Sequence, residues 1–330
     1  LLITLLLDAS QRLLYIPGRS VYYASGAYRG DAKSDAKDAA IIADQARMRR
    51  DLQPLRSGDQ ITVQLRILTA RRADLVADRT RALNRLRAQL LEYFPALERA
   101  FDYGQHKAAL ILLTGYQTPE ALRRAGAARL VAWLRKRKAR TAEAVAAAAL
   151  EAAHAQHTVL PGQDLAAAMV ARLAQEVITL NTEIADTETM LEERFRRHRH
   201  AEIILSMPGF GVILGAEFLA ATRGDMSAFD SADRLAGICG LAPVPRDSGR
   251  ISGNLKRPRR YHRRLLRTCY LAAQSAARTD PASRAYYERK RAEGKHHRQA
   301  VLALARRRLN VLWAMLRDHT TYQIPTAAAA

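Results

Sequence analysis

The 330-residue sequence is poor in acidic residues. It contains 32 Asp and Glu against 53 Lys and Arg, which gives a formal net charge of +21 at pH 7. This imbalance is unlike the near-neutral charge of ordinary soluble enzymes. It favours a polyanionic partner, and nucleic acid is favoured over a membrane surface. The hydrophobic content of 48% is nevertheless ample for sizeable cores, and the length allows about two domains.

The sequence also has few cysteines and no long apolar run. Cys239 and Cys269 lie in apolar, helix-like contexts without the spacing of metal ligands. We therefore expect neither a disulfide framework nor structural zinc, and a reducing, cytoplasmic setting. No run reaches the roughly 18 apolar residues that a membrane-spanning helix needs, so we expect no membrane partner.

The first residues do not include a methionine and are not typical of a signal peptide. The chain begins Leu1-Leu2-Ile3, with no basic segment before the apolar residues and no small-residue cleavage site after them. We interpret this beginning as the interior of a longer protein.

One serine stands in a turn beside a dense basic stretch. Ser248 lies between Pro243 and Pro245 on one side and Gly249 on the other, and residues 246–267 hold nine Lys or Arg and a single acid, Asp247. Clustered guanidinium groups bind phosphates and release counterions from nucleic acid. The alternative is a solvated basic loop with an ordinary turn serine. The predicted phosphate-contacting residues are Arg246, Arg250, Lys256, Arg257, Arg259, Arg260, Arg263 and Arg264.

Three aspartates near the start share one face of a predicted helix. Asp31, Asp35 and Asp38 fall three and four residues apart, and Ala39, Ile42, Ala43 and Ala46 are expected as the buried stripe opposite. Asp35 and Asp38 could be oxygen ligands of Mg²⁺, which takes one or two carboxylates together with substrate phosphate. Alternatively, Lys33 and Lys37 neutralise them, and a helix N-terminus favours Asp in any case.

The remaining pattern is mainly helical. Residues 12–18 are typical of a buried strand leading into a loop, which with the preceding helix makes half of an α/β unit. Residues 58–93 and 164–199 predict two long helices, the first rich in arginine and the second in acids, packed on each other or on a partner chain. On the second, the apolar seam is expected at Leu165, Met169, Leu173, Val177, Leu180, Ile184 and Leu191. Short alanine-rich helices fill residues 104–160, and further helices follow Pro258, Pro281 and Lys295.

Residues 208–211 read Pro-Gly-Phe-Gly between two apolar helical stretches. This is the pattern of a helix-hairpin-helix turn, in which Gly209 and Gly211 let backbone amides approach a phosphate. A plain helix cap or turn needs the same residue types.

Three segments in order resemble one known family. They are RLLYIPGRSVYYASGAYRGDAKSDAKDAAIIADQAR near the start, MPGFGVILGAEFLA in the middle, and FDSADRLAGICGLAPVPRDSG followed by basic residues. Together they resemble the DEDD-type insertion-sequence transposases whose recombination is guided by a bridge RNA. The resemblance covers nearly the whole chain.

The resemblance implies a mostly α protein with a partial α/β part. Residues 1–57 would be the remnant of an RNase H or RuvC-like nuclease domain, 58–200 a helical, coiled-coil-like connector, 201–322 the transposase domain, and 323–330 a disordered tail. It further implies Ser248 as the nucleophile that attacks DNA, Asp35 and Asp38 as Mg²⁺ ligands, DNA and a guide RNA as partners, and a homo-oligomer in the bacterial cytoplasm, associated with the nucleoid.

The family's metal site has two further acids, which would both precede Leu1. Asp8 ends an apolar helix and is assigned to neither role. We therefore expect a truncated chain that is catalytically weak or inactive. Two other functions remain open: a non-catalytic nucleic-acid-binding protein, and a metal-dependent junction nuclease that uses water as nucleophile.

Overall fold

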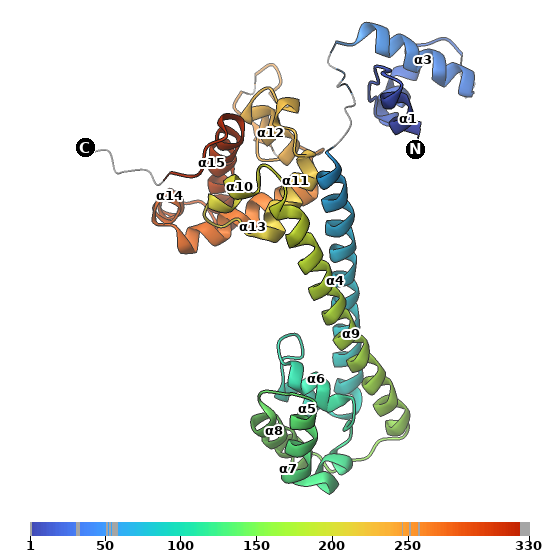
Figure 1. The fold of residues 1–330 in the computed structure, drawn as a ribbon, viewed down its shortest axis with the longest axis vertical. Helices are drawn as coiled ribbons and strands as arrows, with labels where there is room; N and C mark the ends of the chain where they lie inside the picture. The colour runs from blue at the N-terminus through green and yellow to red at the C-terminus, as the bar shows by residue number, and fades with distance from the viewer. Residues whose placement is uncertain are drawn as a thin grey trace. The chain divides into compact units, whose positions relative to one another are not determined.

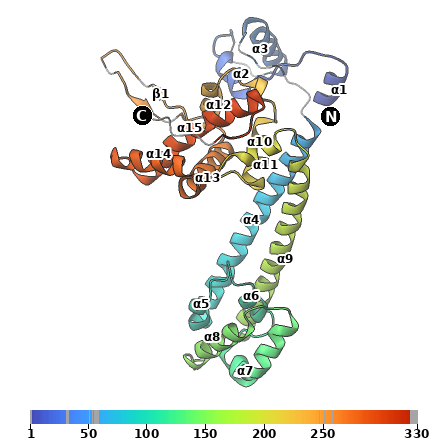
Figure 2. The ribbon, with the colours of Figure 1, turned by 60° about the vertical axis from the view of Figure 1, so that its left-hand side comes forward.

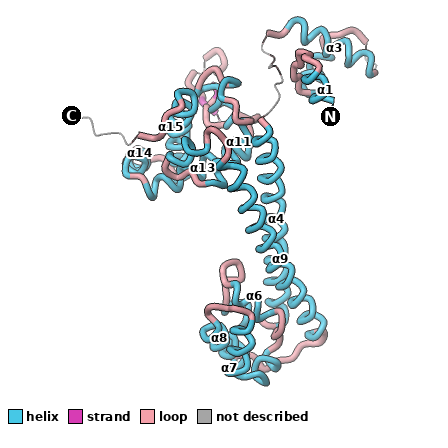
Figure 3. Tube along the Cα trace, in the orientation of Figure 1, coloured by secondary structure: helices cyan, strands magenta, loops and turns pink. Residues whose placement is uncertain are grey.

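The computed structural model describes residues 2–30, 34–50, 52, 54, 59–245, 247–250, 252–256 and 258–323. Helices make up most of this part of the chain, and the strands within it form one small antiparallel sheet (Figure 3). The expectation of a mostly α protein is therefore confirmed. The chain divides into two compact units, one of residues 65–197 and one of residues 1–64 with 198–330. Asp31, Lys33 and all but the first residue of the predicted tail lie outside the described residues.

The N-terminal part begins with short helices joined by turns. The aspartate-bearing helix begins at Asp35, because the side chain of Ser34 accepts a hydrogen bond from the backbone N–H of Lys37 at 3.2 Å and caps it. The helices are α1 (Leu2–Asp8), α2 (Gly18–Ser25) and α3 (Asp35–Met48), and α2 packs against α3.

The predicted buried stripe of α3 is wrong. Ala39, Ile42 and Ala43 are exposed, whereas Ile41 is 1% exposed. The hydroxyl of Tyr28 donates to the Asp44 carboxylate at 2.5 Å, on the side of the helix that Ile41 shares with it. The buried side of α3 is therefore the one that carries Asp38, Ile41 and Asp44.

The predicted strand over residues 12–18 is also wrong. Among the described residues, only Leu14 of this run pairs with another segment, in one antiparallel bridge to Pro54, and Tyr15 is 60% exposed. Pro17, with φ −62°, becomes the N-cap residue of α2. Proline has no N–H to continue a β ladder, and its fixed φ suits the start of a helix.

In the unit of residues 65–197, two long helices run side by side in opposite directions (Figures 1 and 2). They are α4 (Gln60–Tyr93) and α9 (Gln163–Arg196). Their opposite charges face each other: Arg71 pairs with Glu183 at 2.8 Å and Arg72 with Glu188 at 2.7 Å. The two predicted long helices thus pack on each other within the chain.

The seam of α9 is displaced by one or two positions from the predicted one in its first half. Leu165 is 67% exposed and Met169 is 40% exposed, while Ala167, Val170 and Ala174 are buried. Small residues on this face let the neighbouring backbone approach closely, so the larger apolar side chains point away from the core. Further along, Val177 and Leu191 are buried as predicted, and Leu180 and Ile184 are half-buried.

Short helices between α4 and α9 build a separate core. They are α5 (Pro95–Ala100), α6 (Lys107–Leu113), α7 (Pro119–Lys136) and α8 (Ala142–His154). Gly126, with φ 67°, interrupts α7. Trp133 packs edge-to-face on Tyr116, with ring centroids 5.3 Å apart, and lies at the margin of this core.

The C-terminal part is a layered set of helices with one hairpin. Its elements are α10 (Ala201–Ser206), α11 (Val212–Thr222), the 3₁₀ turn η1 (Met226–Ala228), α12 (Ala232–Cys239), β1 (Val244–Pro245), β2 (Leu255–Lys256), α13 (Arg263–Thr279), α14 (Pro281–Ala292) and α15 (His297–Asp318). Helix α13 contacts α11, α14 and α15, and the apolar face that includes Leu265, Ala272 and Ala276 is buried. This framework carries the residues that were predicted to bind nucleic acid.

Candidate nucleic-acid interface

Ser248 lies in the loop of an exposed β-hairpin. Val244 pairs with Lys256 and Pro245 with Leu255, and the loop between them extends away from the helices (Figure 2). The hydroxyl of Ser248 makes no hydrogen bond with any described residue and faces solvent. An approaching phosphodiester would therefore meet no described protein group that competes for this oxygen.

The base of the hairpin is fixed on helix α12. The backbone N–H of His262 donates to the carbonyl oxygen of Ile238 at 2.8 Å. Gly240 ends α12 with φ 73°, and a Cβ at this position would lie 2.6 Å from Cγ of Tyr261. The ring therefore packs directly on the glycine backbone, and the segment from 241 to 260 leaves and returns at one anchored point.

The predicted phosphate-contacting residues of this stretch are exposed and form no ion pair wherever the structure describes them. None of the six forms an ion pair with a described residue, so their charge is available to an external anion. They are Arg250, Lys256, Arg259, Arg260, Arg263 and Arg264. Arg246 and Arg257 lie outside the described residues.

The helix expected from Pro258 begins five residues later. Residues 258–262 are not helical, and the ring nitrogen Nδ1 of His262 accepts from the backbone N–H of Leu265 at 3.0 Å. This cap fixes the start of α13 at Arg263. Arg263 and Arg264 consequently lie in the first helical turn, whereas Arg259 and Arg260 precede it.

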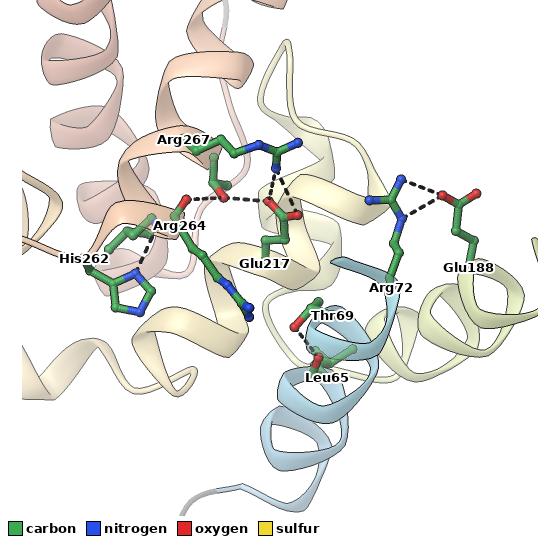
Figure 4. Close-up of polar contacts among 10 residues, drawn as sticks. Leu65, Thr69, Arg72, Glu188, Glu217, His262, Arg264 and Arg267 are labelled. Atoms are coloured by element: carbon green, nitrogen blue, oxygen red, sulfur yellow. Dashed lines mark hydrogen bonds and ion pairs between the residues drawn. The ribbon is translucent and has the colours of Figure 1, made fainter. Parts of the chain in front are cut away.

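The sequence did not predict a carboxylate that contacts the beginning of α13. Glu217 of α11 accepts from the hydroxyl of Thr268 at 2.8 Å and from the guanidinium of Arg267 at 3.3 Å (Figure 4). Its side chain is only 14% exposed, and Thr268 is fully buried. The contact joins α11 to the first turns of α13 and so orients the basic end of that helix. Spacing along the chain could not have revealed a pair separated by some fifty residues.

The two glycines of the predicted turn differ in their surroundings. Gly209 has φ 83°, and a Cβ there would lie 2.2 Å from the carbonyl oxygen of Ala272 and 2.9 Å from the N of Ala276. Close packing on α13 is thus sufficient reason for a glycine at this position. Gly211 has no atom within 4 Å of its would-be Cβ and is the exposed N-cap residue of α11. Phosphate contact by either remains a prediction.

The same turn is held by a buried arginine. Arg308 of α15 is 6% exposed; it donates to the carbonyl oxygen of Pro208 and, at 2.8 Å, to the hydroxyl of Ser283. Asp280 supplies the nearby negative charge, 3.9 Å away. Although it belongs to a basic run in the sequence, this arginine is a packing residue.

Asp35 and Asp38 occupy the first turn of α3, as predicted. Neither carboxylate forms an ion pair or hydrogen bond with a described residue, and the amine of Lys37 donates to the carbonyl oxygen of Gly30 instead. Two unpaired carboxylates one turn apart fit the donor preference of Mg²⁺. Among the residues that the structure describes, no group of three or more His, Cys, Asp or Glu side chains could hold a metal ion.

Several arginines of the first long helix have protein partners. Besides Arg71 and Arg72, Arg79 donates to the side-chain oxygen of Asn181 on α9 at 2.5 Å. Arg87 pairs with Glu98 at 2.8 Å. The acids that balance this helix come from elsewhere in the chain, which the local composition did not show.

Histidines form a second buried polar group that the sequence did not predict. His198 is 5% exposed and His200 is 2% exposed, and the ring of His200 stacks on that of His319 with centroids 5.5 Å apart. Nε2 of His198 lies 3.4 Å from the carboxylate of Asp59. Burial lowers the pKa of both His198 and His200, the latter to about 4, so both rings are neutral packing groups at pH 7.

The two cysteines are neighbours. Cys239 of α12 and Cys269 of α13 are buried free thiols with their Sγ atoms 3.5 Å apart. The contact with Cys269, together with burial, raises the pKa of the Cys239 thiol, so it is not a reactive thiolate.

Within the described residues, no helix has the length and apolar character needed to cross a membrane.

Comparison with known proteins matches both ends of the chain to transposases. Residues 1–95 match the model of the DEDD transposases of IS110, described as "Transposase". Residues 201–288 match "Transposase IS116/IS110/IS902 family". The second match contains α10 to α13, the hairpin with Ser248, and most of α14.

Full-length relatives agree with these matches. The chain is 74% identical over 330 residues, all of this chain and 83% of the relative, to the "Insertion element IS900 uncharacterized 42 kDa protein" of Mycobacterium paratuberculosis. It is 54% identical over 318 residues, 96% of this chain and 79% of the relative, to the "Insertion element IS116 uncharacterized 44.8 kDa protein" of Streptomyces clavuligerus.

A third similarity is to the "Insertion element IS110 uncharacterized 43.6 kDa protein" of Streptomyces coelicolor, 39% identical over 323 residues, 97% of this chain and 80% of the relative. Identity at this level over nearly the whole chain, together with the two family models, shows the family. The chain belongs to the IS110/IS116 family of insertion-element transposases.

Proposed function

We propose that Ser248 is the nucleophile of DNA strand cleavage and exchange. Its oxygen attacks a phosphodiester phosphorus, a new Oγ–P bond forms, and the bond from phosphorus to the 3′ oxygen breaks. The serine loses its proton and the departing 3′ oxygen gains one. A freed 3′ hydroxyl later attacks the phosphoserine and restores both the serine and a phosphodiester, so no bond energy is lost between the two steps.

The single observation that carries this proposal is the setting of Ser248. Its hydroxyl is exposed on a hairpin with an anchored base, without a competing partner among the described residues, and beside unneutralised arginines. A nucleophile must be accessible, and charge that builds up on the phosphoryl oxygens is stabilised by cations already in position. An ordinary turn serine would not need cations beside it.

The basic residues contribute before and during the reaction. Arg259 and Arg260 precede α13, and Arg263 and Arg264 lie in its first turn, which is oriented by the contact of Glu217 with Thr268 and Arg267. Arg250 and Lys256 lie on the hairpin itself. Together they bind the backbone of DNA and hold the phosphate at the serine, in the predicted interface that Gly209 and Gly211 extend.

Asp35 and Asp38 are proposed to hold a divalent cation, Mg²⁺. When bound, such an ion neutralises phosphate oxygens and lowers the pKa of a coordinated hydroxyl. The two carboxylates lie one turn apart in α3 without a basic partner among the described residues. Both lie at the capped end of the helix, which fixes the backbone that carries them.

We also propose a role for each part of the chain. Residues 1–57 would derive from a RuvC-like nuclease domain, 58–200 would act as the helical connector, and 201–322 would be the transposase domain. We further propose a guide RNA as partner and a homo-oligomer as the active form. Strand exchange joins two duplexes and so needs more than one nucleophile.

A covalent adduct assay tests the proposal. The full chain is incubated with Mg²⁺ and a nicked, labelled duplex that prevents religation, under single-turnover conditions, and adducts are separated on a denaturing gel. We expect slow adduct formation by the unmodified chain and by Ser252→Ala, in keeping with the weak catalysis expected of this chain, and no adduct with Ser248→Ala, while all three bind DNA equally. An adduct that survives Ser248→Ala rejects the nucleophile, and cleavage without any adduct supports a water-using nuclease instead.

A further inference from the structure

Helices α14 and α15 carry a second basic cluster, apart from the stretch around Ser248. Three cations gather around the ring of Tyr286: Arg289 at 5.0 Å, Lys290 at 5.5 Å and Arg307 at 4.9 Å from its centroid. The first two come from the same helix as the tyrosine, and Arg307 comes from α15, which packs against it (Figure 1). The cluster is therefore built by tertiary packing.

The charge of this cluster is not balanced by the described part of the protein. Lys290 pairs with Glu293 at 2.8 Å, but Lys295 shares the same carboxylate at 3.5 Å. Arg289 and Arg307 are exposed and form no ion pair with a described residue. Residues 281–308 hold nine Lys or Arg and two acids, and of the nine only Arg306 and Arg308 pair with described acids outside this range, Asp233 and Asp280. Like charges held around one ring repel each other, so the arrangement favours an external polyanion.

The aromatic residues of the cluster indicate which part of a nucleic acid it meets. The ring of Tyr286 is half-buried, and three cations lie within 5.5 Å of its centroid. The hydroxyl of the neighbouring Tyr287 lies 2.8 Å from Nδ1 of His297. Neither ring is a free platform for base stacking, which single-stranded nucleic acids use. The cluster is suited to the phosphate backbone of a duplex instead.

We propose that Arg289 and Arg307, held by Tyr286, form a second binding surface for the backbone of double-stranded DNA. This inference rests on the proposed function, because a protein that cleaves DNA at Ser248 must also hold the duplex beyond the cleaved phosphate. The contacts are to phosphates, so they add affinity without reading sequence.

The test measures binding of the full chain in a Ser248→Ala background, so that no covalent step intervenes. Duplex DNA of arbitrary sequence is titrated at several salt concentrations, with duplex RNA and single-stranded DNA of the same sequence in parallel. We expect the Arg289→Gln/Arg307→Gln double variant to bind duplex DNA about tenfold more weakly. Its slope of log K against log salt should fall by about 0.9 for each phosphate that the variant no longer neutralises.

A matched pair controls for net charge. Arg234→Gln/Arg317→Gln removes the same charge from arginines that already pair with carboxylates, Asp230 at 2.9 Å and Asp318 at 2.6 Å. This pair should change the affinity for duplex DNA by less than about twofold. Tyr286→Leu should weaken binding, and Tyr286→Phe, which keeps the ring, should restore it.

The outcomes separate this inference from the proposed nucleophile. An unchanged affinity and slope for Arg289→Gln/Arg307→Gln overturns the surface, as does an equal loss of affinity in the control pair or a loss confined to duplex RNA or single strands. None of these results depends on adduct formation. Conversely, an adduct that persists in Ser248→Ala rejects the nucleophile and leaves the binding measurement intact.

Discussion

The buried hydroxyl of Thr268 donates a hydrogen bond to the carboxylate of Glu217 at 2.8 Å. The two residues belong to α13 and α11, and the same carboxylate receives the guanidinium of Arg267 at 3.3 Å. This contact fixes the helix that carries the basic end of the candidate interface. The orientation of that end therefore depends on a residue outside the basic stretch.

Glu217→Ala should lower the free energy of unfolding by about 0.5–1.5 kcal/mol, because Thr268 and Arg267 lose an acceptor while the Thr268 hydroxyl keeps the carbonyl oxygen of Arg264 at 3.0 Å. Urea titration followed by circular dichroism measures the change. Glu202→Ala, at an exposed position of α10, should stay within about 0.5 kcal/mol of the unmodified chain. Equal effects of the two substitutions would show that the contact adds nothing.

The two turn glycines offer a matched comparison. Gly209→Ala requires a Cβ 2.2 Å from the carbonyl oxygen of Ala272 and a left-handed φ of 83°. We expect a loss of roughly 2–5 kcal/mol from strain and overpacking. Gly211→Ala meets no atom within 4 Å and should cost no more than about 1 kcal/mol as an N-cap change. Thermal melts of both variants check this, and a stable Gly209→Ala would contradict the close packing on α13.

Arg307 and Arg308 are adjacent in sequence and opposite in role. Arg308→Gln leaves Asp280 and the carbonyl oxygen of Pro208 without their buried cation, so the free energy of unfolding should fall by about 3–5 kcal/mol. Arg307→Gln removes an exposed charge and should change stability by less than about 0.5 kcal/mol. Chemical denaturation of the two variants distinguishes them, and similar losses would mean that Arg307 is also a packing residue.

The buried histidines predict a pH dependence of stability. Burial lowers the pKa of His200 from 6.5 to about 4, with His198, Arg199 and His319 adding to the effect. Between these values the unfolded chain binds more protons than the folded one, so stability falls as the pH is lowered through the window. Melting temperatures from pH 7.5 to 4 should show this fall, and His200→Gln should reduce its slope. The exposed His157→Gln is the control, and an unchanged slope in His200→Gln would count against the assignment.

Much of the helical fold could be predicted from local sequence patterns. The long helices around residues 60–93 and 163–196, and the break at Gly126, follow from apolar spacing and from glycine and proline. The seam of α9 could not be placed as well, because Ala167 and Ala174 fill the core while the larger Leu165 is exposed. Apolar spacing favours large residues, whereas close helix packing favours small ones.

Only those parts of the candidate site that are formed by residues close together in the sequence could be predicted. The turn residues around Ser248 indicated an exposed serine, and the spacing of Asp35 and Asp38 indicated a helix that carries both. Glu217 and Arg308 act through partners far away in the chain, at Thr268 and Pro208, which no spacing rule reveals. The partners of the arginines on α4 are also distant in sequence, since their acids lie on α9.

Locating the DNA adduct on the protein tests the central proposal most directly. After single-turnover cleavage and nuclease digestion, the chain is cut with trypsin and analysed by tandem mass spectrometry. Ser248 and Ser252 fall in different peptides, since Arg250 separates them. We predict a phosphonucleotide on Ser248 in the peptide of residues 247–250. A phosphonucleotide on Ser252, or on any residue other than Ser248, would contradict it.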